Sequence, residues 1–330
     1  MVLMSGLSCL NAQCQKMTVH KTDGTEVEFD TEDIDSITFK GGSSNVFDLS
    51  KGQNGYPPTI TLSSGYEMPI IGMGCYALHD DVCRNAILSA IRQGFRKFDT
   101  ASFYGNEVEV GDAIRQAISE GLVTREELFV TTKLYPGSEF ANPEQAIERC
   151  LQKLNIGYID LMLLHHPGTN DVKAYKAMEH YVAEGKIRSL GVSNFYVKEM
   201  TEFLPQVDTK PVLVQNEIHP YYQEQQVVKF MHQQGIVVEA WYPLGGRGYN
   251  TELLKEPVLQ QIADAHGVSL VQVILRWDLQ RGIVVIPGSS NPAHQKENIS
   301  LFDFELSADE MQRINALDRG EKHDWYYHKI

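Results

Sequence analysis

The sequence predicts an α/β protein that folds as a (β/α)8 barrel (TIM barrel), with a β-hairpin extension before the barrel and a substrate loop at the C-terminus. Two observations predict this fold. Short apolar runs alternate with helical patterns eight times after Ile70, and this region has the size of a barrel. Several runs, such as Leu161–Leu164 and Ile283–Ile286, are continuously apolar, as expected of parallel strands buried on both faces.

The first 14 residues are small and apolar, and they resemble the apolar core and cleavage region of an export signal. The basic region that opens such a signal is missing, because the first basic residue is Lys16. We therefore interpret residues 1–14 as a truncated signal or a tail. We expect a cytoplasmic protein, with export as the alternative.

Residues 15–55 are expected to form a small hairpin extension and a linker. Met17–His20 and Thr25–Phe29 alternate apolar and polar residues around Asp23-Gly24, which is a strong hairpin pattern. Gly41–Asn45 has the composition of a flexible linker. A lone hairpin is marginal in water, so we expect it to dock on the main body or on a partner, without catalytic work.

Residues 56–330 are expected to form the barrel, after an opening hairpin at Thr59–Leu62 and Glu67–Pro69. The predicted strands are Ile70–Gly74, Lys97–Asp99, Leu128–Lys133, Tyr158–His165, Ile187–Ser193, Val212–Glu217, Val237–Ala240 and Ile283–Pro287. The helices are expected at Asp81–Gln93, Glu107–Glu120, Pro143–Leu154 (capped by Asn142), Val172–Ala183, Val197–Phe203, Gln223–Gln234, within Val258–Gln280, at Ala293–Ile299 and at Ser307–Leu317. A doubly wound open sheet would need a G-x-G-x-x-G turn, which Gly72-Met73-Gly74 does not continue.

Composition excludes several classes of protein. A net charge of -14 over 330 residues argues against nucleic-acid binding. No apolar run reaches the roughly 18 residues of a membrane span. The five cysteines are scattered, odd in number and without a C-x-x-C pair, so neither structural disulfides nor a zinc site is expected.

Four titratable residues follow or end predicted strands, where the active site of a barrel is built: Asp99, Tyr104, Lys133 and His165. A lysine beside a phenol favours the phenolate, and a carboxylate keeps that lysine charged and placed. We therefore expect an Asp-Lys-Tyr chain to bring the pKa of Tyr104 closer to neutral pH, with a neutral histidine that orients a carbonyl. Singly, these residues could be a cap, a solvated lysine or core packing. His165 and His166 could be a metal pair, but adjacent strand residues point to opposite faces.

The motifs around these residues resemble those of the aldo-keto reductase family, including its bacterial diketogluconate-reductase-like members. Asp99-Thr-Ala-Ser-Phe-Tyr104-Gly-Asn-Glu107 is similar to the family's D-T-A-x-x-Y-x-N-E pattern. Similar segments follow in the family's order: Thr131–Leu134, Asp160–Pro167, Gly191–Phe195, Gln215–Pro220 and Ile286–Asn298. The resemblance runs from about Thr59 to the C-terminal tail and leaves the first 55 residues unexplained.

The resemblance implies hydride transfer from NAD(P)H to a carbonyl without a metal. It makes Tyr104 the general acid, Lys133 and Asp99 its tuning pair, and His165 the group that orients the carbonyl. Ser193, Asn194 and Gln215 would hold the nicotinamide carboxamide, and Trp241 would stack on the ring where the family usually has tyrosine. The remaining expected cofactor contacts are Pro243, Leu244, Gly246, Gly288, Ser289, Ser290, His294, Glu297 and Asn298, with Gly245–Gly248 folding over the pyrophosphate.

One departure from the family concerns the cofactor's phosphate end. Where the family often has a lysine and an arginine that bind the 2′-phosphate of NADPH, this sequence has Gly288 and His294. Losing both cations removes charge-assisted contacts. We therefore expect NADH to compete with NADPH, with Ser289 and Ser290 left to contact the ribose.

The substrate pocket is expected to be apolar and aromatic, which suits small aldehydes, ketones or keto acids. Its candidate walls are Tyr76, Phe103, Tyr135, His166 (where the family commonly has tryptophan) and Trp325. A monomer is implied by the resemblance. Two alternatives remain: a nicotinamide-binding sensor or regulatory subunit docked through the hairpin, and a metal-dependent hydrolase, for which the sequence offers no convergent set of metal ligands.

Overall fold

The computed structural model describes residues 16–20, 26–30, 47–51, 56–246, 251–320 and 322. The chain divides into two compact units, Met1–Gly42 and Ser43–Ile330. In the first unit, β1 (Lys16–His20) pairs antiparallel with β2 (Glu26–Asp30). The predicted hairpin strands are therefore confirmed, whereas the Asp23-Gly24 turn and the Gly41–Asn45 linker lie outside the described residues.

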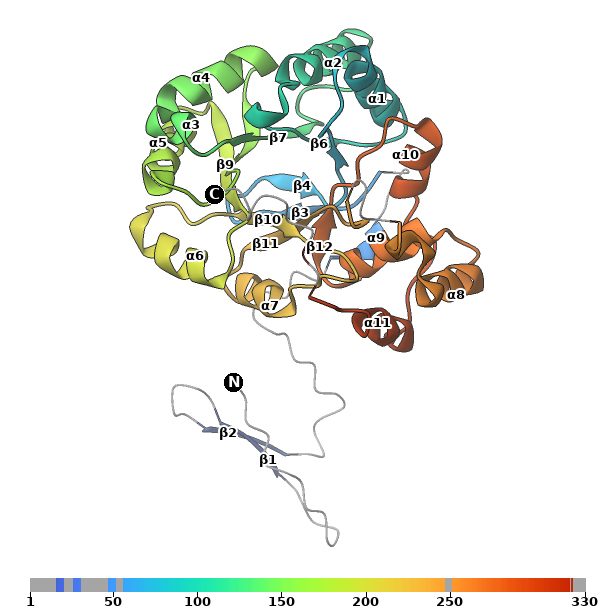
Figure 1. Ribbon diagram of the computed structural model, residues 1–330. Coiled ribbons are helices and arrows are strands. Elements are labelled where there is room, and N and C mark those ends of the chain that lie inside the picture. Colours follow the sequence, from blue (N-terminus) through green and yellow to red (C-terminus); the bar gives the residue numbers. More distant parts are fainter. Residues whose placement is uncertain are drawn as a thin grey trace, which may run out of the picture. The chain divides into compact units, whose positions relative to one another are not determined.

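Eight parallel strands form the central sheet of the second unit, in the order of the sequence (Figure 1). They are β5 (Met73–Gly74), β6 (Lys97–Asp99), β7 (Phe129–Leu134), β8 (Ile159–Leu164), β9 (Ile187–Ser193), β10 (Leu213–Glu217), β11 (Val237–Trp241) and β12 (Ile283–Val285). A parallel bridge between Ile71 and Val285 joins the two ends of the sheet, and the amide of Gly72 donates to the Val285 carbonyl at 2.9 Å. The sheet thereby closes, which confirms the predicted (β/α)8 barrel.

Helices surround the strands in Figure 1. They are α1 (Asp80–Arg92), α2 (Glu107–Ser119), α3 (Ser138–Ala141), α4 (Pro143–Leu154), α5 (Asp171–Ala183), α6 (Val197–Phe203), α7 (Gln225–Gln233), α8 (Pro257–His266), α9 (Leu270–Gln280), α10 (Pro292–Ile299) and α11 (Ala308–Asn315). Short 3-10 turns are η2 (Leu49–Lys51), η3 (Ser102–Tyr104), η4 (Leu204–Gln206) and η5 (Leu253–Lys255). Every predicted helix is present, and α3 was not predicted.

Two local expectations are corrected. Asn142 is the N-cap residue of α4, but its side chain makes no capping hydrogen bond. It is also the C-cap residue of α3, and its side-chain amide donates to the Ser138 carbonyl instead. The first predicted strand, Ile70–Gly74, contains a regular strand only at Met73–Gly74, because Ile70 and Ile71 instead join the last strand of the barrel.

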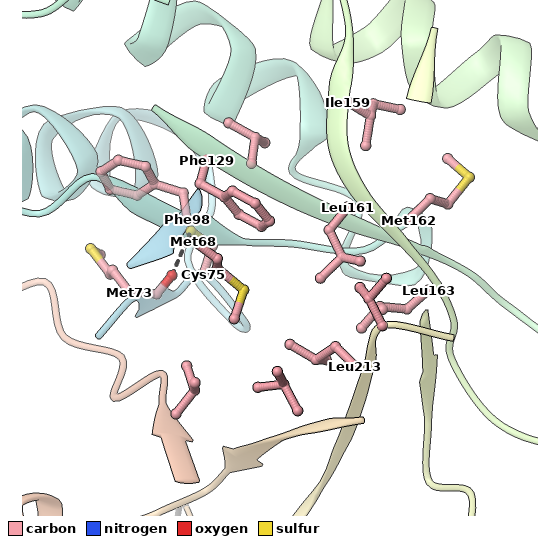
Figure 2. Close-up of a cluster of buried hydrophobic side chains, with 14 of the residues drawn as sticks. Met68, Met73, Cys75, Phe98, Phe129, Ile159, Leu161, Met162, Leu163 and Leu213 are labelled. Atoms are coloured by element: carbon pink, nitrogen blue, oxygen red, sulfur yellow. Dashed lines mark hydrogen bonds between the residues drawn. The ribbon is translucent and has the colours of Figure 1, made fainter. Parts of the chain in front are cut away.

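The opening hairpin of β3 (Thr59–Thr61) and β4 (Glu67–Pro69) covers the end of the barrel where the strands begin. The Ser64 hydroxyl lies 2.7 Å from that of Ser189 in the first half of β9, and the Arg188 guanidinium lies over the Tyr66 ring. Met68 is fully buried, and Figure 2 shows it in a cluster with apolar side chains of β5, β6, β7, β8 and β10. This end is therefore closed by packing, and the carboxyl ends of the strands remain for a site.

Helix α2 approaches the end of α4 closely at Gly111. A Cβ atom on this glycine would lie 2.0 Å from the Leu154 carbonyl oxygen, which also accepts a hydrogen bond from Arg115. Only a residue without a side chain allows this approach, so Gly111 fixes how the two helices pack.

Within the described residues, no single helix is both long and apolar enough to cross a membrane. Helices α8 and α9 pass the same test only as a pair, which is bent by 91°.

Candidate active site

A cavity of about 260 Å³ opens where the barrel strands end, and most of the predicted site residues line it. From the predicted set, the lining residues are Tyr76, Asp99, Phe103, Tyr104, Tyr135, His165, His166, Ser193, Asn194, Gln215, Trp241, Pro243, Leu244, Gly246, Gly288, Ser289 and Ser290. These residues come from many different strand ends and loops. The expectation that one site is assembled from the same end of many strands therefore agrees with the geometry.

Asp99, Lys133 and Tyr104 form a connected chain. The Lys133 ammonium donates to Oδ1 of Asp99 at 2.5 Å and to the Thr100 carbonyl at 3.0 Å, and it lies 3.4 Å from the Tyr104 hydroxyl. Lys133 is fully buried and does not line the cavity, so it acts on the cavity only through its neighbours.

The loop after β6 is held in place by its own sequence. Tyr104 ends the turn η3, and Gly105 follows it in the left-handed conformation, with φ of 68°. The Asn106 amide donates to the carbonyls of Cys75 and Leu78, both at 2.8 Å, and Glu107 accepts from Thr132 at 2.6 Å. Asn106 and Glu107 therefore fix the backbone that presents Tyr104 to the cavity.

His165 follows β8 and faces Tyr104. Its backbone amide donates to the Leu134 carbonyl at 2.9 Å, and its ring meets the Tyr104 ring edge to face, with centroids 5.5 Å apart. The rings of His165 and His166 stack, with centroids 4.9 Å apart and planes 11° from parallel. The expectation that they point to opposite faces was wrong, because both residues lie beyond the end of β8, where strand alternation no longer applies.

Burial controls the protonation of the site. It lowers the pKa of His165 well below its ordinary value, with Lys133 and His166 acting in the same direction, so this imidazole is neutral at pH 7. It also raises the pKa of Tyr104 well above its usual range, and the Asp99 carboxylate adds to the rise. The expectation that Lys133 brings the pKa of Tyr104 closer to neutral pH was wrong, because desolvation of the buried phenol has the larger effect. Burial lowers the pKa of Lys133, and its contact with Asp99 opposes this.

A second set of hydrogen bonds orders the neighbouring strand ends. Asn194, which follows β9, donates to the His165 carbonyl at 2.9 Å and accepts from the Trp241 indole at 3.1 Å. The Ser193 hydroxyl donates to the Gln215 carbonyl at 2.8 Å. These bonds fix the orientation of the Trp241 indole, which ends β11 and lines the cavity.

Four predicted site residues do not line the cavity, and a fifth is not described by the structure. His294, Glu297 and Asn298 belong to α10 and do not line the cavity; His294 is exposed and Asn298 is buried. Lys133 lies behind Asp99, as described above. Trp325 lies outside the described residues, as does the Arg247-Gly248 half of the glycine-rich loop.

The cavity also contains a residue that the sequence did not suggest. Tyr242 has a left-handed backbone, with φ of 52°, and its ring lies 6.4 Å from that of Tyr76 and 5.0 Å from Trp241. A Cβ atom on Gly246 would lie 2.4 Å from this ring, so Gly246 is required for the ring's position. Its place directly after the strand end at Trp241 was the available signal. The other unpredicted lining residues are Gly74, Leu78, Ile286 and Pro287.

The part of the chain that the structure describes contains no group of three or more histidine, cysteine, aspartate or glutamate side chains that could hold a metal ion.

Comparisons with known proteins match this fold. A sequence profile described as the aldo/keto reductase family matches residues 71–319. An uncharacterized oxidoreductase of Bacillus subtilis is 41% identical over 78% of this chain and 92% of its own length. An NADH-dependent D-xylose reductase of Candida parapsilosis is 36% identical over 79% of this chain and 92% of its own length. The crystal structure of a Bombyx mori aldo-keto reductase in complex with NADP superposes with a TM-score of 0.75 at 33% identity, over 81% of this chain and 94% of that one.

A closed barrel with this cavity, together with these similarities, defines an NAD(P)H-dependent oxidoreductase of carbonyl compounds. The chain belongs to the aldo/keto reductase family.

Proposed function

We propose that the protein reduces the carbonyl of a small aldehyde, ketone or keto acid, with Tyr104 as the general acid. The observation that carries this assignment is the chain from Asp99 through Lys133 to the Tyr104 hydroxyl, which ends in the cavity. The neutral imidazole of His165 lies beside the phenol and would orient the carbonyl oxygen.

The protonation of the site is compatible with carbonyl reduction. Burial raises the pKa of Tyr104, so its phenol carries a proton at neutral pH, as an ordinary phenol does, and can donate it to an oxygen that gains negative charge. Lys133 would stabilise the phenolate that remains, and Asp99 balances the charge of Lys133. Oxidation of an alcohol would instead need the phenolate at the start.

The cavity fits a nicotinamide cofactor. Trp241 offers an aromatic face, and the polar side chains of Ser193, Asn194 and Gln215 lie beside it. Gly288 approaches the first strand closely, since a Cβ atom there would lie 2.7 Å from the Gly74 carbonyl oxygen. When bound, the cofactor would supply the hydride; Trp241 would stack on its ring, and the three polar side chains would hold its carboxamide.

We also propose that NADH competes with NADPH. Gly288 offers no cation for a 2′-phosphate, while the Ser289 and Ser290 side chains remain at the cavity for the ribose. His294, Glu297 and Asn298 on α10 would lie further along the adenosine end. Titration with both cofactors tests this, and a strong preference for NADPH would overturn it.

The walls of the cavity support a compact, partly aromatic substrate. Phe103 stacks on Tyr135 with centroids 4.3 Å apart, and Tyr135 meets His166 edge to face at 5.9 Å. Tyr76 packs against Tyr104 at 5.0 Å. We propose that these rings enclose the substrate around its carbonyl and that Trp325 adds to them. A panel of aldehydes, ketones and keto acids, followed at the nicotinamide absorbance, would rank the substrates.

For the organisation of the chain, we propose a tail or truncated signal at 1–14, a hairpin extension and linker at 15–55, and the reductase barrel at 56–330. We propose a cytoplasmic monomer that binds neither nucleic acid nor membranes. Light scattering of the purified full chain tests the oligomeric state, and cell fractionation tests the location, where secretion would favour the export alternative.

Tyr104→Phe tests the central assignment, with Tyr76→Phe as the matched loss of a hydroxyl in the same cavity. Removing a general acid is expected to lower kcat by about 10²- to 10⁴-fold. The dissociation constant of the cofactor should stay the same, because the ring is kept. If wild type binds the cofactor without turning over any carbonyl, the sensor alternative gains support. Loss of wild-type activity with a chelator would favour the metal-dependent hydrolase.

A further inference from the structure

An ion pair crosses the inside of the barrel beneath the cavity. Lys97 at the start of β6 contacts Glu239 in β11, and neither side chain is exposed. Barrel interiors are usually filled by branched apolar side chains. Burying two charges is expensive even when they are paired, so this pair calls for an explanation beyond stability.

Gln215 connects this ion pair to the proposed catalytic chain. Its side-chain amide nitrogen donates at 2.8 Å both to Oε1 of Glu239 and to Oδ2 of Asp99. The amide nitrogen has two hydrogens, and both are used. Because each acceptor is a carboxylate oxygen, only one of the two amide orientations is possible.

That orientation leaves the side-chain carbonyl oxygen of Gln215, Oε1, as the atom available to a ligand. Gln215 lines the cavity, and within the described residues its Oε1 atom has no hydrogen-bond donor. An oxygen at this place accepts N–H groups and repels carbonyl groups. It would therefore accept from the –NH₂ half of a carboxamide.

We propose that Glu239, balanced by Lys97, is a positioning residue that fixes the Gln215 amide so that its oxygen faces the carboxamide N–H of the cofactor. The inference rests on the proposed function, because it needs a nicotinamide in the cavity. It assigns a role to two residues that touch neither substrate nor cofactor.

The arrangement tolerates either protonation state of the pair. Burial lowers the pKa of Lys97, to about 7, and the negative charge of Asp99 opposes this. If the proton moves to Oε2 of Glu239, which is the atom that contacts Lys97, then Oε1 still accepts from Gln215. The orientation of Gln215 is the same in both cases.

Two double variants isolate the hydrogen-bond acceptor at position 239. Lys97→Met with Glu239→Leu removes both charges and the acceptor, and Lys97→Met with Glu239→Gln removes both charges but keeps an amide oxygen that can turn toward Gln215. Replacing a buried ion pair by neutral side chains of similar size is usually tolerated. Both variants therefore lack the two buried charges of wild type, and they differ from each other in the amide group at position 239, which supplies the acceptor.

The measurement compares NADP⁺ with its 3-acetylpyridine analogue, in which a methyl ketone replaces the carboxamide and offers no N–H. Dissociation constants are measured by titration calorimetry on the full chain. Because of one additional hydrogen bond, wild type is expected to bind NADP⁺ about tenfold more tightly than the analogue. In the leucine variant Asp99 still accepts one amide hydrogen of Gln215, but the other hydrogen loses its acceptor and the amide is held less firmly. The ratio is expected to fall below about threefold there and to return to within about twofold of wild type in the glutamine variant.

Asp160→Asn is the matched control, since Asp160 is a buried carboxylate paired with Arg125 at 2.6 Å and does not line the cavity. It should leave the ratio unchanged even if it lowers the unfolding midpoint. Equal ratios in wild type and the folded leucine variant would overturn the inference. If the leucine variant does not fold, a wild-type-like ratio in the glutamine variant supports the inference, and a collapsed ratio there overturns it.

Failure of the proposed function has a different outcome. A wild-type protein that binds neither dinucleotide, or a Tyr104→Phe variant with full turnover, contradicts the proposed reaction itself. A different outcome contradicts only the role of Glu239: turnover that depends on Tyr104, together with the same NADP⁺-to-analogue ratio in wild type and in the leucine variant.

Discussion

The ammonium nitrogen of Lys133 lies 2.5 Å from Oδ1 of Asp99, and the two side chains are 0% and 2% exposed. Each of these groups would be unstable alone in such a place, since an isolated charge loses its hydration on burial. As a pair they carry a charge to within 3.4 Å of the Tyr104 hydroxyl. The pair therefore brings a cation to the proposed proton donor without exposing it to water.

Lys133→Met should impair both catalysis and stability. We expect kcat to fall by about 10²-fold or more, because the Tyr104 phenolate loses its cation. The free energy of unfolding should fall by about 3 to 5 kcal/mol, since Asp99 is left buried without its partner. Steady-state kinetics and urea unfolding measure the two effects. Lys153→Met removes a half-exposed lysine 3.7 Å from Glu107 and should change neither by much; normal turnover in the Lys133 variant would contradict the proposed role.

His165→Asn should flatten the dependence of stability on pH. The folded-state pKa of His165 lies well below its ordinary value of 6.5, so the unfolded chain binds a proton first as the pH falls. The stabilisation is therefore present above pH 6.5 and is lost below it, by up to about 1.4 kcal/mol per pH unit. Urea unfolding between pH 5 and 7.5 should show a shallower slope in the variant. His180→Asn, at an exposed position, should keep the wild-type slope, and equal slopes in all three proteins would refute the assignment.

His294→Arg should shift cofactor preference toward NADPH. The change places a cation on exposed α10, where a charge-assisted contact to the 2′-phosphate is worth roughly 1.5 to 3 kcal/mol, or about tenfold or more in relative affinity. The ratio of dissociation constants for NADH and NADPH measures it. His180→Arg adds the same charge on α5 and should leave the ratio unchanged. An unchanged ratio for His294→Arg would remove α10 from the phosphate end.

Gly288→Lys is expected to be the poorer route to the same preference. Its Cβ atom would lie 2.7 Å from the Gly74 carbonyl oxygen, which is backbone and cannot rotate away. The lysine should therefore lower the unfolding midpoint as well as change cofactor preference. An unchanged midpoint in thermal unfolding would show that the backbone around Gly74 moves easily.

Gly111→Ala should destabilise the barrel although alanine favours helices. Intrinsic propensity predicts a gain of about 1 kcal/mol for this change within α2. The added methyl group would lie 2.0 Å from the Leu154 carbonyl oxygen, so α2 and α4 must separate, and we expect a net loss of about 1 to 3 kcal/mol. Urea unfolding compares it with Gln116→Ala, on the exposed side of the same helix, which should change stability by less than about 0.5 kcal/mol. A more stable Gly111→Ala protein would contradict the close approach.

The strand order and the end of the barrel that carries the site could be predicted from the sequence, because continuous apolar runs and strand-end polar residues are local patterns. The short helix α3 could not, because four residues are too few for a helical period. The stacking of His165 on His166 was missed because the rule for strands was applied one residue past the strand.

Contacts across the barrel could not be predicted from the sequence for another reason. Lys97 and Glu239 both stand in predicted strands, but they are far apart in the chain, and no local pattern indicates that they meet inside the barrel. Tyr242 was missed because its ring direction follows from a left-handed backbone, and a bulky residue rarely adopts one. The same limit applies to the direction in which the pKa of Tyr104 shifts, because that shift depends on how deeply the folded chain buries the phenol.

The bridge between Ile71 and Val285 makes the order of assembly matter. These residues stand at opposite ends of the barrel sequence, so the last contact of the ring forms only after β12 has left the ribosome. Until then β5 and β11 remain open edges that can pair with other chains. Gly74 and Gly288, which meet beside this junction, both line the cavity. The cavity is therefore complete only when the final strand has joined the sheet. A chain shortened before β12 lacks both the closed barrel and the cavity residues that follow β12.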